Sequence, residues 1–263
     1  MKKIVLGLAI GLLVVNVGFA GIEWKSKTVT QGEAKEANNA VVMQLYAQGG
    51  NVRQDFISVE RQEDMRRPGG YWLYKADGNR LYSVDPSQKT YSEIPLDFIF
   101  RMGGLFGQIV KIKITDPLVK FEKLGTETIM GYSCQHSRLV IDYDMEVKIA
   151  FIKNRSHEHI DKETWTASQI KGFLDIGEGF RYRDYKTGNQ DLDQLIEVQL
   201  KAEQGLGFPL KTVSVTTSTD KKGNVKEKSR MTQEVLSLAV KNISAALFEI
   251  PVGYQEKEFL VQE

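Results

Sequence analysis

The 263-residue sequence is poor in cysteine and histidine, with Cys134 as its one cysteine and only three histidines. A chain with a single cysteine has no intramolecular disulfide, so burial of apolar side chains must hold its fold together. Cys134 is predicted to be a small buried core residue. The alternative is a reactive or intermolecular thiol, for which His136, two residues further along the chain, is the one nearby base.

Sequence motifs that identify a catalytic mechanism are also missing. The sequence has no Gly-x-Ser-x-Gly nucleophile elbow and no glycine-rich phosphate loop followed by lysine. We therefore expect no catalytic residues, no cofactor and no enzymatic activity.

The sequence has no large charge of either sign, since 35 lysines and arginines face 34 acidic residues for a formal net charge of +1. Removing residues 1–20 takes away two lysines and no acid, which leaves 243 residues with a net charge of −1. Nucleic acid binding needs a cationic surface, so nucleic acid is not expected as the main partner. The net charge does not exclude a local basic patch. The length suits a single domain over residues 21–263.

Long hydrophobic runs are absent except at the start of the chain. Lys2 and Lys3 precede an uncharged run over residues 4–17, and small residues occupy the positions three and one before Gly21. This pattern is typical of a secretory signal peptide cleaved after Ala20. The alternative is an uncleaved membrane anchor. After cleavage we expect an exported protein with no stable membrane span.

Apolar side chains at alternate positions predict a large antiparallel sheet. Between residues 111 and 153 they lie on one face of successive strands that turn at Met130–Gly131. The residues concerned are Ile112, Ile114, Met145, Val147, Ile149 and Phe151. Short strands separated by Gly, Pro, Asp and Asn turns are predicted elsewhere. They cover residues 24–30, 41–47, 52–61, 71–74, 80–84, 90–94 and 211–217, with a return strand that ends near residues 236–240.

Helical patterns are fewer. The strongest spans Asn189–Gln204, where Asn189 or Asp191 can cap the start, Gly205 ends it, and leucines share one face. Residues 162–174 also place apolar side chains at near-helical spacing, and the polar residues 154–161 before them are predicted to form a solvated loop.

An apolar segment at residues 95–110 is too short to span a membrane and too apolar for a free loop. We expect a helical or irregular flap on the apolar face of the sheet. Five of its side chains are predicted to form the lid or lining of a ligand cavity, namely Leu96, Phe98, Phe100, Leu105 and Phe106. The alternative is an ordinary filled core.

Each of two polar clusters in the sequence has two alternative roles. His157, His159 and Asp161 would share one side of a strand and offer metal ligands, but no fourth ligand is visible, so no metal site is predicted. The lysines at 221, 222, 226 and 228 are predicted to protect a hairpin from edge pairing. Contact with anionic lipid headgroups is their alternative role.

Three segments occur in order behind the predicted signal peptide: GTETIMGYSC at residues 125–134, GFPLKT at 207–212 and LFEIPVGY at 247–254. In this order they resemble exported bacterial proteins of unknown function related to the outer-membrane lipoprotein carrier and receptor (LolA/LolB-like) superfamily. The resemblance implies an α+β, mainly β fold, in which a strongly curved antiparallel sheet forms a half-open barrel and helices cover its concave face. It also implies a periplasmic location.

Together these observations lead to the hypothesis of a periplasmic, non-enzymatic binding protein that holds a lipid, an acyl chain or a lipoprotein in an apolar cavity. Such a cavity replaces water around each buried methylene at about 0.8 kcal/mol. The alternative is a sensor or protein-interaction module that uses the same fold to contact an envelope protein.

Overall fold

The computed structural model describes residues 21–33, 38–61, 66–94, 110–149, 152–170 and 189–259. The predicted signal peptide and the predicted flap at residues 95–109 lie outside these ranges.

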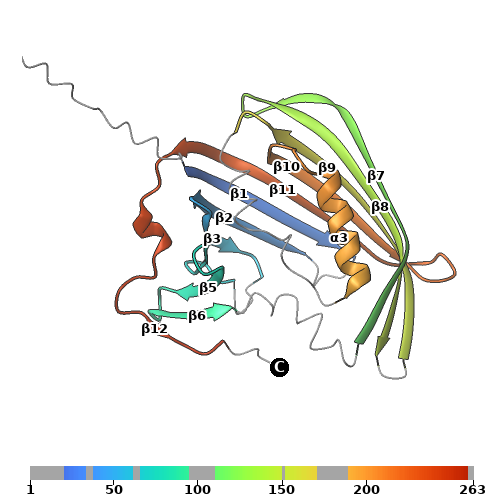
Figure 1. The fold of residues 1–263 in the computed structure, drawn as a ribbon, viewed down its shortest axis with the longest axis horizontal. Coiled ribbons are helices and arrows are strands. Elements are labelled where there is room, and N and C mark those ends of the chain that lie inside the picture. Colours follow the sequence, from blue (N-terminus) through green and yellow to red (C-terminus); the bar gives the residue numbers. More distant parts are fainter. Residues whose placement is uncertain are drawn as a thin grey trace, which may run out of the picture.

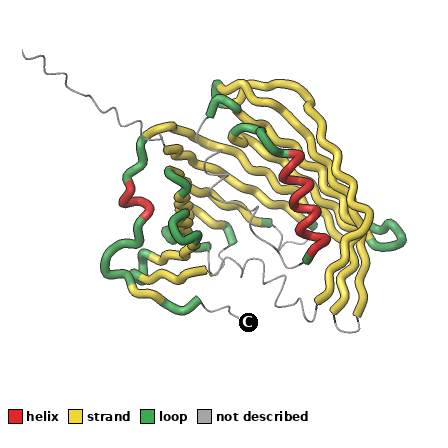
Figure 2. Tube along the Cα trace, in the orientation of Figure 1, coloured by secondary structure: helices red, strands yellow, loops and turns green. Residues whose placement is uncertain are grey.

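A single sheet of twelve strands makes up most of the described chain (Figures 1 and 2). The strands are β1 (Gly21–Gly32), β2 (Asn39–Gln48), β3 (Asn51–Val59), β4 (Tyr71–Lys75), β5 (Arg80–Asp85), β6 (Thr90–Ile94), β7 (Val110–Ile129), β8 (Tyr132–Ile149), β9 (Ile152–Ala167), β10 (Phe208–Thr219), β11 (Val225–Lys241) and β12 (Gln255–Glu256). Their order is β12-β6-β5-β4-β3-β2-β1-β11-β10-β9-β8-β7. Because β12 and β7 stand at opposite ends of this order, the curved sheet is open. The predicted mainly β fold is confirmed.

The meander β7–β8–β9 forms as the period-two pattern predicts. Ile112 pairs with Val147, and Ile114 pairs with Met145, so their apolar side chains share one face. The turn between β7 and β8 uses positive φ angles at Met130 (53°) and Gly131 (81°). Glycine reaches that region without strain, which explains why the chain reverses there.

Two sequence predictions around β9 are wrong. Residues 154–161, expected as a loop, and 162–167, expected to begin a helix, are one strand. Residues 154–161 have polar side chains on both faces, so their sequence lacks the apolar–polar alternation that predicts a strand. In the second part Thr164, Trp165, Thr166 and Ala167 are all buried, so alternation is lost there too.

Residues that pair directly across neighbouring strands point to the same face of the sheet, which defines two faces. We call front the face that carries Trp24, Leu45, Leu139 and Ile141, and back the opposite face. A row of directly paired polar residues crosses the middle of the front face, with Thr28, Gln233, Thr212, Thr164 and Ser137 in that order. The row separates one apolar cluster around Trp24 and Phe208 from another around Leu139 and Ile141.

The sole α-helix of the described chain, α3 (Gln190–Ala202), matches the predicted helix closely. The Asn189 side chain caps it by accepting a hydrogen bond from the backbone N–H of Leu192 (3.0 Å). Several helices over the sheet, as the resemblance implied, are not seen in the described residues. A short 3-10 helix, η3 (Ala245–Phe248), packs against β3 and β4 on the back face, where Phe248 lies in one cluster with Leu73 and Tyr82.

Candidate functional site

None of the five predicted cavity residues, Leu96, Phe98, Phe100, Leu105 and Phe106, lies within the described residues. The site is therefore built from the surfaces that the rest of the chain places together. Two of them are candidates: the apolar surface beneath α3, and a polar pocket where β7, β8 and β9 meet the β10–β11 hairpin.

Helix α3 is fixed to the front face at both of its ends. At its start, the Asp191 carboxylate accepts a hydrogen bond from the backbone N–H of Ile114 (3.1 Å), and the Asn189 amide donates to the carbonyl of Ile112 (2.6 Å). These contacts satisfy backbone groups of β7, which is an outermost strand of the sheet. At its end, Glu203 pairs with Lys162 of β9 (2.6 Å). The helix is thus tied across three strands.

Beneath α3, Leu195 is buried with Ile114, Leu139 and Ile141. Around this core the front-face apolar side chains are only half-buried, and they are Ile112, Val119, Phe121, Tyr143 and Ile160. A 13-residue helix is about 20 Å long, whereas the 20-residue strand β7 extends over about 65 Å. One helix of this length leaves an apolar surface on the sheet that is accessible in part.

Next to this apolar surface, the front face carries a buried carboxylate. Glu158 is 7% exposed, and its one described hydrogen-bond partner is the Ser218 hydroxyl, which donates at 2.8 Å. It pairs across β8 and β9 with Tyr143, whose pKa is raised by burial and, to a smaller extent, by the Glu158 charge. A ligand on this face would thus meet both apolar and polar groups.

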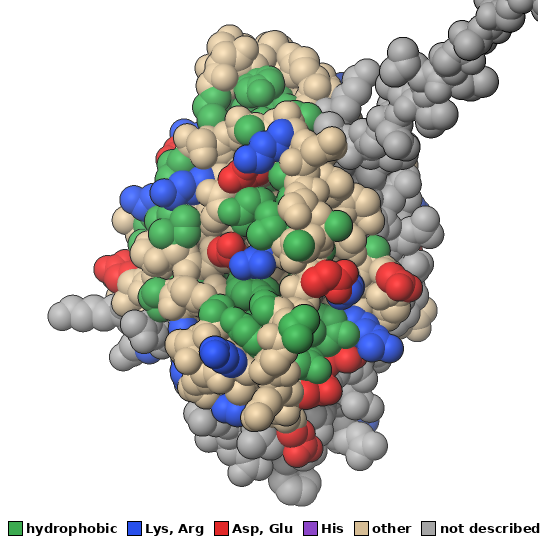
Figure 3. All heavy atoms as spheres, turned by 90° about the vertical axis from the view of Figure 1, so that its left-hand side faces the viewer, with side chains coloured by type: hydrophobic (Ala, Val, Ile, Leu, Met, Phe, Trp, Pro, Cys, Tyr) green, Lys and Arg blue, Asp and Glu red, His purple; other side chains and the backbone are tan. Residues whose placement is uncertain are grey.

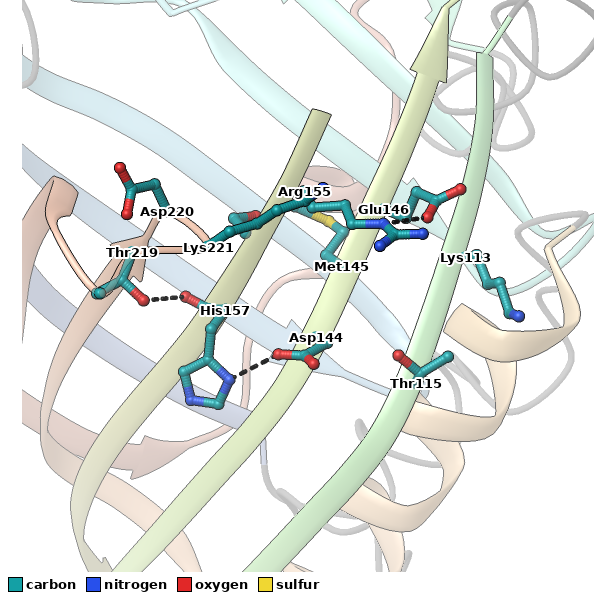
Figure 4. Close-up of a pocket in the computed structure, with 12 residues that line it drawn as sticks. Lys113, Thr115, Asp144, Met145, Glu146, Arg155, His157, Thr219, Asp220 and Lys221 are labelled. Carbon is teal, nitrogen blue, oxygen red and sulfur yellow. Dashed lines mark hydrogen bonds and ion pairs between the residues drawn. The ribbon is translucent and has the colours of Figure 1, made fainter. Parts of the chain in front are cut away.

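The polar pocket has a volume of about 620 Å³ and opens at the end of β7–β9 (Figure 4). Its acids are engaged within the protein. Asp144 pairs with His157 (2.9 Å), and Asp220 accepts hydrogen bonds within its own turn, chiefly from Asn224. Hydrogen bonds from Lys153 and Arg155 hold the pKa of Glu146 below its usual range.

Two cations of the same pocket lack a partner among the described residues. Lys113 and Lys221 line it, and neither has a hydrogen bond or ion pair from its ammonium group to another residue of the described ranges. Three acids and three cations line the pocket, so its formal charge is balanced, and Lys113 and Lys221 are the cations that it offers to a ligand. Its residues come from four separate stretches of sequence, so only strand register could have placed them together. Of the residues singled out in the sequence, Lys221 of the lysine cluster and His157 of the histidine cluster line this pocket.

All three histidines lie on the back face beside carboxylates. His159 contacts Asp142 (2.6 Å), and His136 contacts Glu163 (2.8 Å) while its ring stacks on Trp165. His157 and His159 do share one side of a strand, as the rejected metal alternative required. Within the described ranges, however, no group of three or more His, Cys, Asp or Glu side chains is arranged to hold a metal ion.

Cys134 is buried with 0% exposure, which confirms its prediction as a core residue. Its Sγ donates to the carbonyl of Tyr132 (3.5 Å), and burial raises the pKa of the thiol. A nucleophilic cysteine needs the opposite environment, with a lowered pKa and access to solvent.

A family model described as a domain of unknown function, DUF4412, matches residues 31–254. No curated protein matches the chain. Within the described residues, no helix has the length and apolar composition needed to cross a membrane.

Three solved structures match the chain over most of their length, at low structural similarity. An uncharacterized conserved protein from Thermus thermophilus is 10% identical, with a TM-score of 0.34 over 90% of this chain and 91% of that one. The lipoprotein LppX from Mycobacterium tuberculosis is 9% identical, with a TM-score of 0.31 over 82% and 86%. A DUF1329 family protein from Desulfovibrio piger is 8% identical, with a TM-score of 0.16 over 89% and 91%. These scores are too low to transfer a function to this chain.

Proposed function

Starting from the fact that the chain belongs to the DUF4412 family of domains of unknown function, we propose that it is a periplasmic, non-enzymatic protein that binds a lipid or an acyl chain. The ligand lies on the front face of the open sheet, which forms a half-barrel, beside α3.

The observation that carries this proposal is the accessible apolar surface around α3. Val119 and Phe121 of β7 and Tyr143 of β8 are half-buried next to a fully buried core, so their exposed area is available to an apolar ligand. In Figure 1, α3 lies on the inner side of the bend of the sheet, where a long chain would be sheltered on two sides. Each methylene moved from water to this surface contributes up to about 0.8 kcal/mol.

The absence of an enzymatic role is also part of the proposal. Cys134 has a raised thiol pKa and no contact with solvent, and His136 is held by Glu163 and Trp165 rather than by the thiol. These two residues were the nucleophile and base that the sequence offered, and their surroundings suit a structural role.

Native mass spectrometry of protein expressed from the full 263-residue sequence tests the proposal. We expect a co-purifying species that lipid extraction identifies as an acyl lipid, on a polypeptide whose mass corresponds to cleavage after Ala20. Phe121→Arg, on the front face, should remove the lipid. Leu118→Arg is the matched control, because Leu118 lies on the same strand but points to the opposite face and is 47% exposed.

The predicted lid is tested in the same assay by making Phe98 and Phe106 charged, which should also release the lipid. An apo mass that no added lipid shifts would overturn the proposal and favour a protein-contacting module. Loss of the lipid from Leu118→Arg as well would show that the front face does not hold it.

A further inference from the structure

Three lysines face one another at the end of β7, β8 and β9. Lys111 pairs directly with Lys148, and Lys148 pairs directly with Lys153. Directly opposed residues in a sheet have Cβ atoms about 5 Å apart, and like charges at such positions destabilise the sheet. Lys153 contacts Glu146 (2.7 Å), but Lys111 and Lys148 have no carboxylate partner in the described part of the chain. Such a row is unfavourable unless an anion covers it.

Further cations surround this row. The next row pairs Lys113 with Glu146 and Glu146 with Arg155. Lys226 of the β10–β11 hairpin contacts the side chain of Asn154 (2.9 Å), which pairs with Val147, so the hairpin lies beside the same end of the sheet. We call this surface the basic end, which comprises residues 111–113, 144–149, 152–157 and 219–228. It contains nine lysines and arginines against four acids in a protein of net charge near zero.

Charge is distributed differently elsewhere. Figure 3 shows the side that faces left in Figure 1, where blue and red side chains are interspersed among hydrophobic ones. The basic end lies at the right of Figure 1. The excess of positive charge at the basic end can orient the protein on a negatively charged surface.

Exposed apolar side chains stand among these cations. Ile152, the first residue of β9, is 73% exposed, and Val225, the first residue of β11, is 53% exposed. An isolated exposed apolar residue needs no explanation. Ile152 and Val225 lie near the tips of neighbouring hairpins, and each is followed by a lysine. Such a pattern suits a surface that binds headgroups and places apolar side chains at the acyl boundary.

We propose that the basic end docks the protein on a membrane that contains anionic phospholipids. Lysines of the basic end contact the headgroup phosphates. The pocket lined by Lys113 and Lys221 receives one phosphate, and Ile152 enters the interface. This is the alternative role of the hairpin lysines, now joined by cations from β7, β8 and β9. The lysine row lies on the back face, so its contribution to docking is separate from ligand binding on the front face.

Vesicle co-sedimentation of the protein expressed from the full sequence tests the proposal. We expect binding to vesicles that mix phosphatidylglycerol with phosphatidylcholine, little binding to pure phosphatidylcholine, and weaker binding as salt increases. A basic residue near an anionic surface contributes roughly fivefold to partitioning. The triple variant Lys111→Gln, Lys148→Gln, Lys153→Gln should therefore bind about a hundredfold more weakly, and Ile152→Ser should also bind more weakly at unchanged charge.

The matched control is Lys27→Gln, Lys120→Gln, Lys123→Gln, which removes the same charge from exposed positions outside the basic end. We expect it to bind almost as the unchanged protein does. The triple variant Lys111→Gln, Lys148→Gln, Lys153→Gln should unfold at the same temperature as the unchanged protein or higher, because removing the three charges relieves their repulsion. Equal loss in both triple variants, no preference for phosphatidylglycerol, or full competition by soluble glycerophosphate at matched phosphate concentration would overturn docking on a membrane.

Discussion

Replacement of Leu195 by alanine measures how firmly α3 is packed on the sheet. Leu195 is 7% exposed and lies in one cluster with Ile114, Leu139 and Ile141. Leucine-to-alanine changes at buried sites cost about 2–5 kcal/mol, and sites that can collapse or admit water lie at the lower end. Since several neighbours in this cluster are half-exposed, we expect a loss of about 2–3 kcal/mol in the free energy of unfolding.

The measurement is urea unfolding followed by tryptophan fluorescence. For a chain of this length, the expected loss corresponds to a fall of about 4–12 °C in melting temperature. Val198→Ala is the control, because Val198 lies on the same helix but is 41% exposed, and its change should stay within about 0.5 kcal/mol. Equal effects of the two variants, or a loss below about 1 kcal/mol for Leu195→Ala, would refute the packing of α3 on the front face.

Three further predictions concern single sites. In Gly207→Ala the added Cβ would lie 2.3 Å from the Ala167 carbonyl oxygen. Urea unfolding should therefore show a loss of about 1–3 kcal/mol in the free energy of unfolding. An unchanged free energy would contradict this close approach. Burial raises the pKa of the Cys134 thiol, so at about pH 8 iodoacetamide should modify it far more slowly in the native protein than in denaturant; equal rates would contradict its burial. The hydrogen bond from Arg138 lowers the pKa of Asp161, so this pair stabilises the fold above the unfolded pKa of about 4, and the stabilisation is lost as the pH falls through the folded pKa. Asp161→Asn should therefore reduce the loss of stability between about pH 5 and pH 2, and an unchanged pH profile of urea unfolding would count against the pair.

The sequence was a good guide to strands that alternate and end in marked turns. The Met130–Gly131 turn, the Gly49–Gly50 turn and the hairpin at residues 221–224 all occur where turn residues predicted them. Helix α3 was equally visible, because a capping residue, an apolar stripe and a terminal glycine agree on its limits. Local chemistry decides these elements, so local sequence reveals them.

The histidine segment shows why a strand can escape prediction. His157 and His159 face Asp144 and Asp142 of β8, and Asp161 binds Arg138 of the same strand through two hydrogen bonds. The strand is stabilised in part by charges that lie some 13 to 23 residues away in sequence. Read alone, this segment is a polar run without alternation, which is also what a loop looks like.

The basic end depends on strand register, which no single segment contains. Ile112, which packs in the cluster beneath α3, pairs with Val147 on the front face, and this register forces Lys148 to lie between Lys111 and Lys153 on the back. A slip of one residue would turn every side chain of β8 to the other face. Burial of the apolar side chains on the front face therefore prevents a register shift that would separate the lysines on the back face. Packing beneath α3 thus offsets the strain of the lysine row. It follows that Leu195→Ala and Lys148→Gln should shift stability in opposite directions.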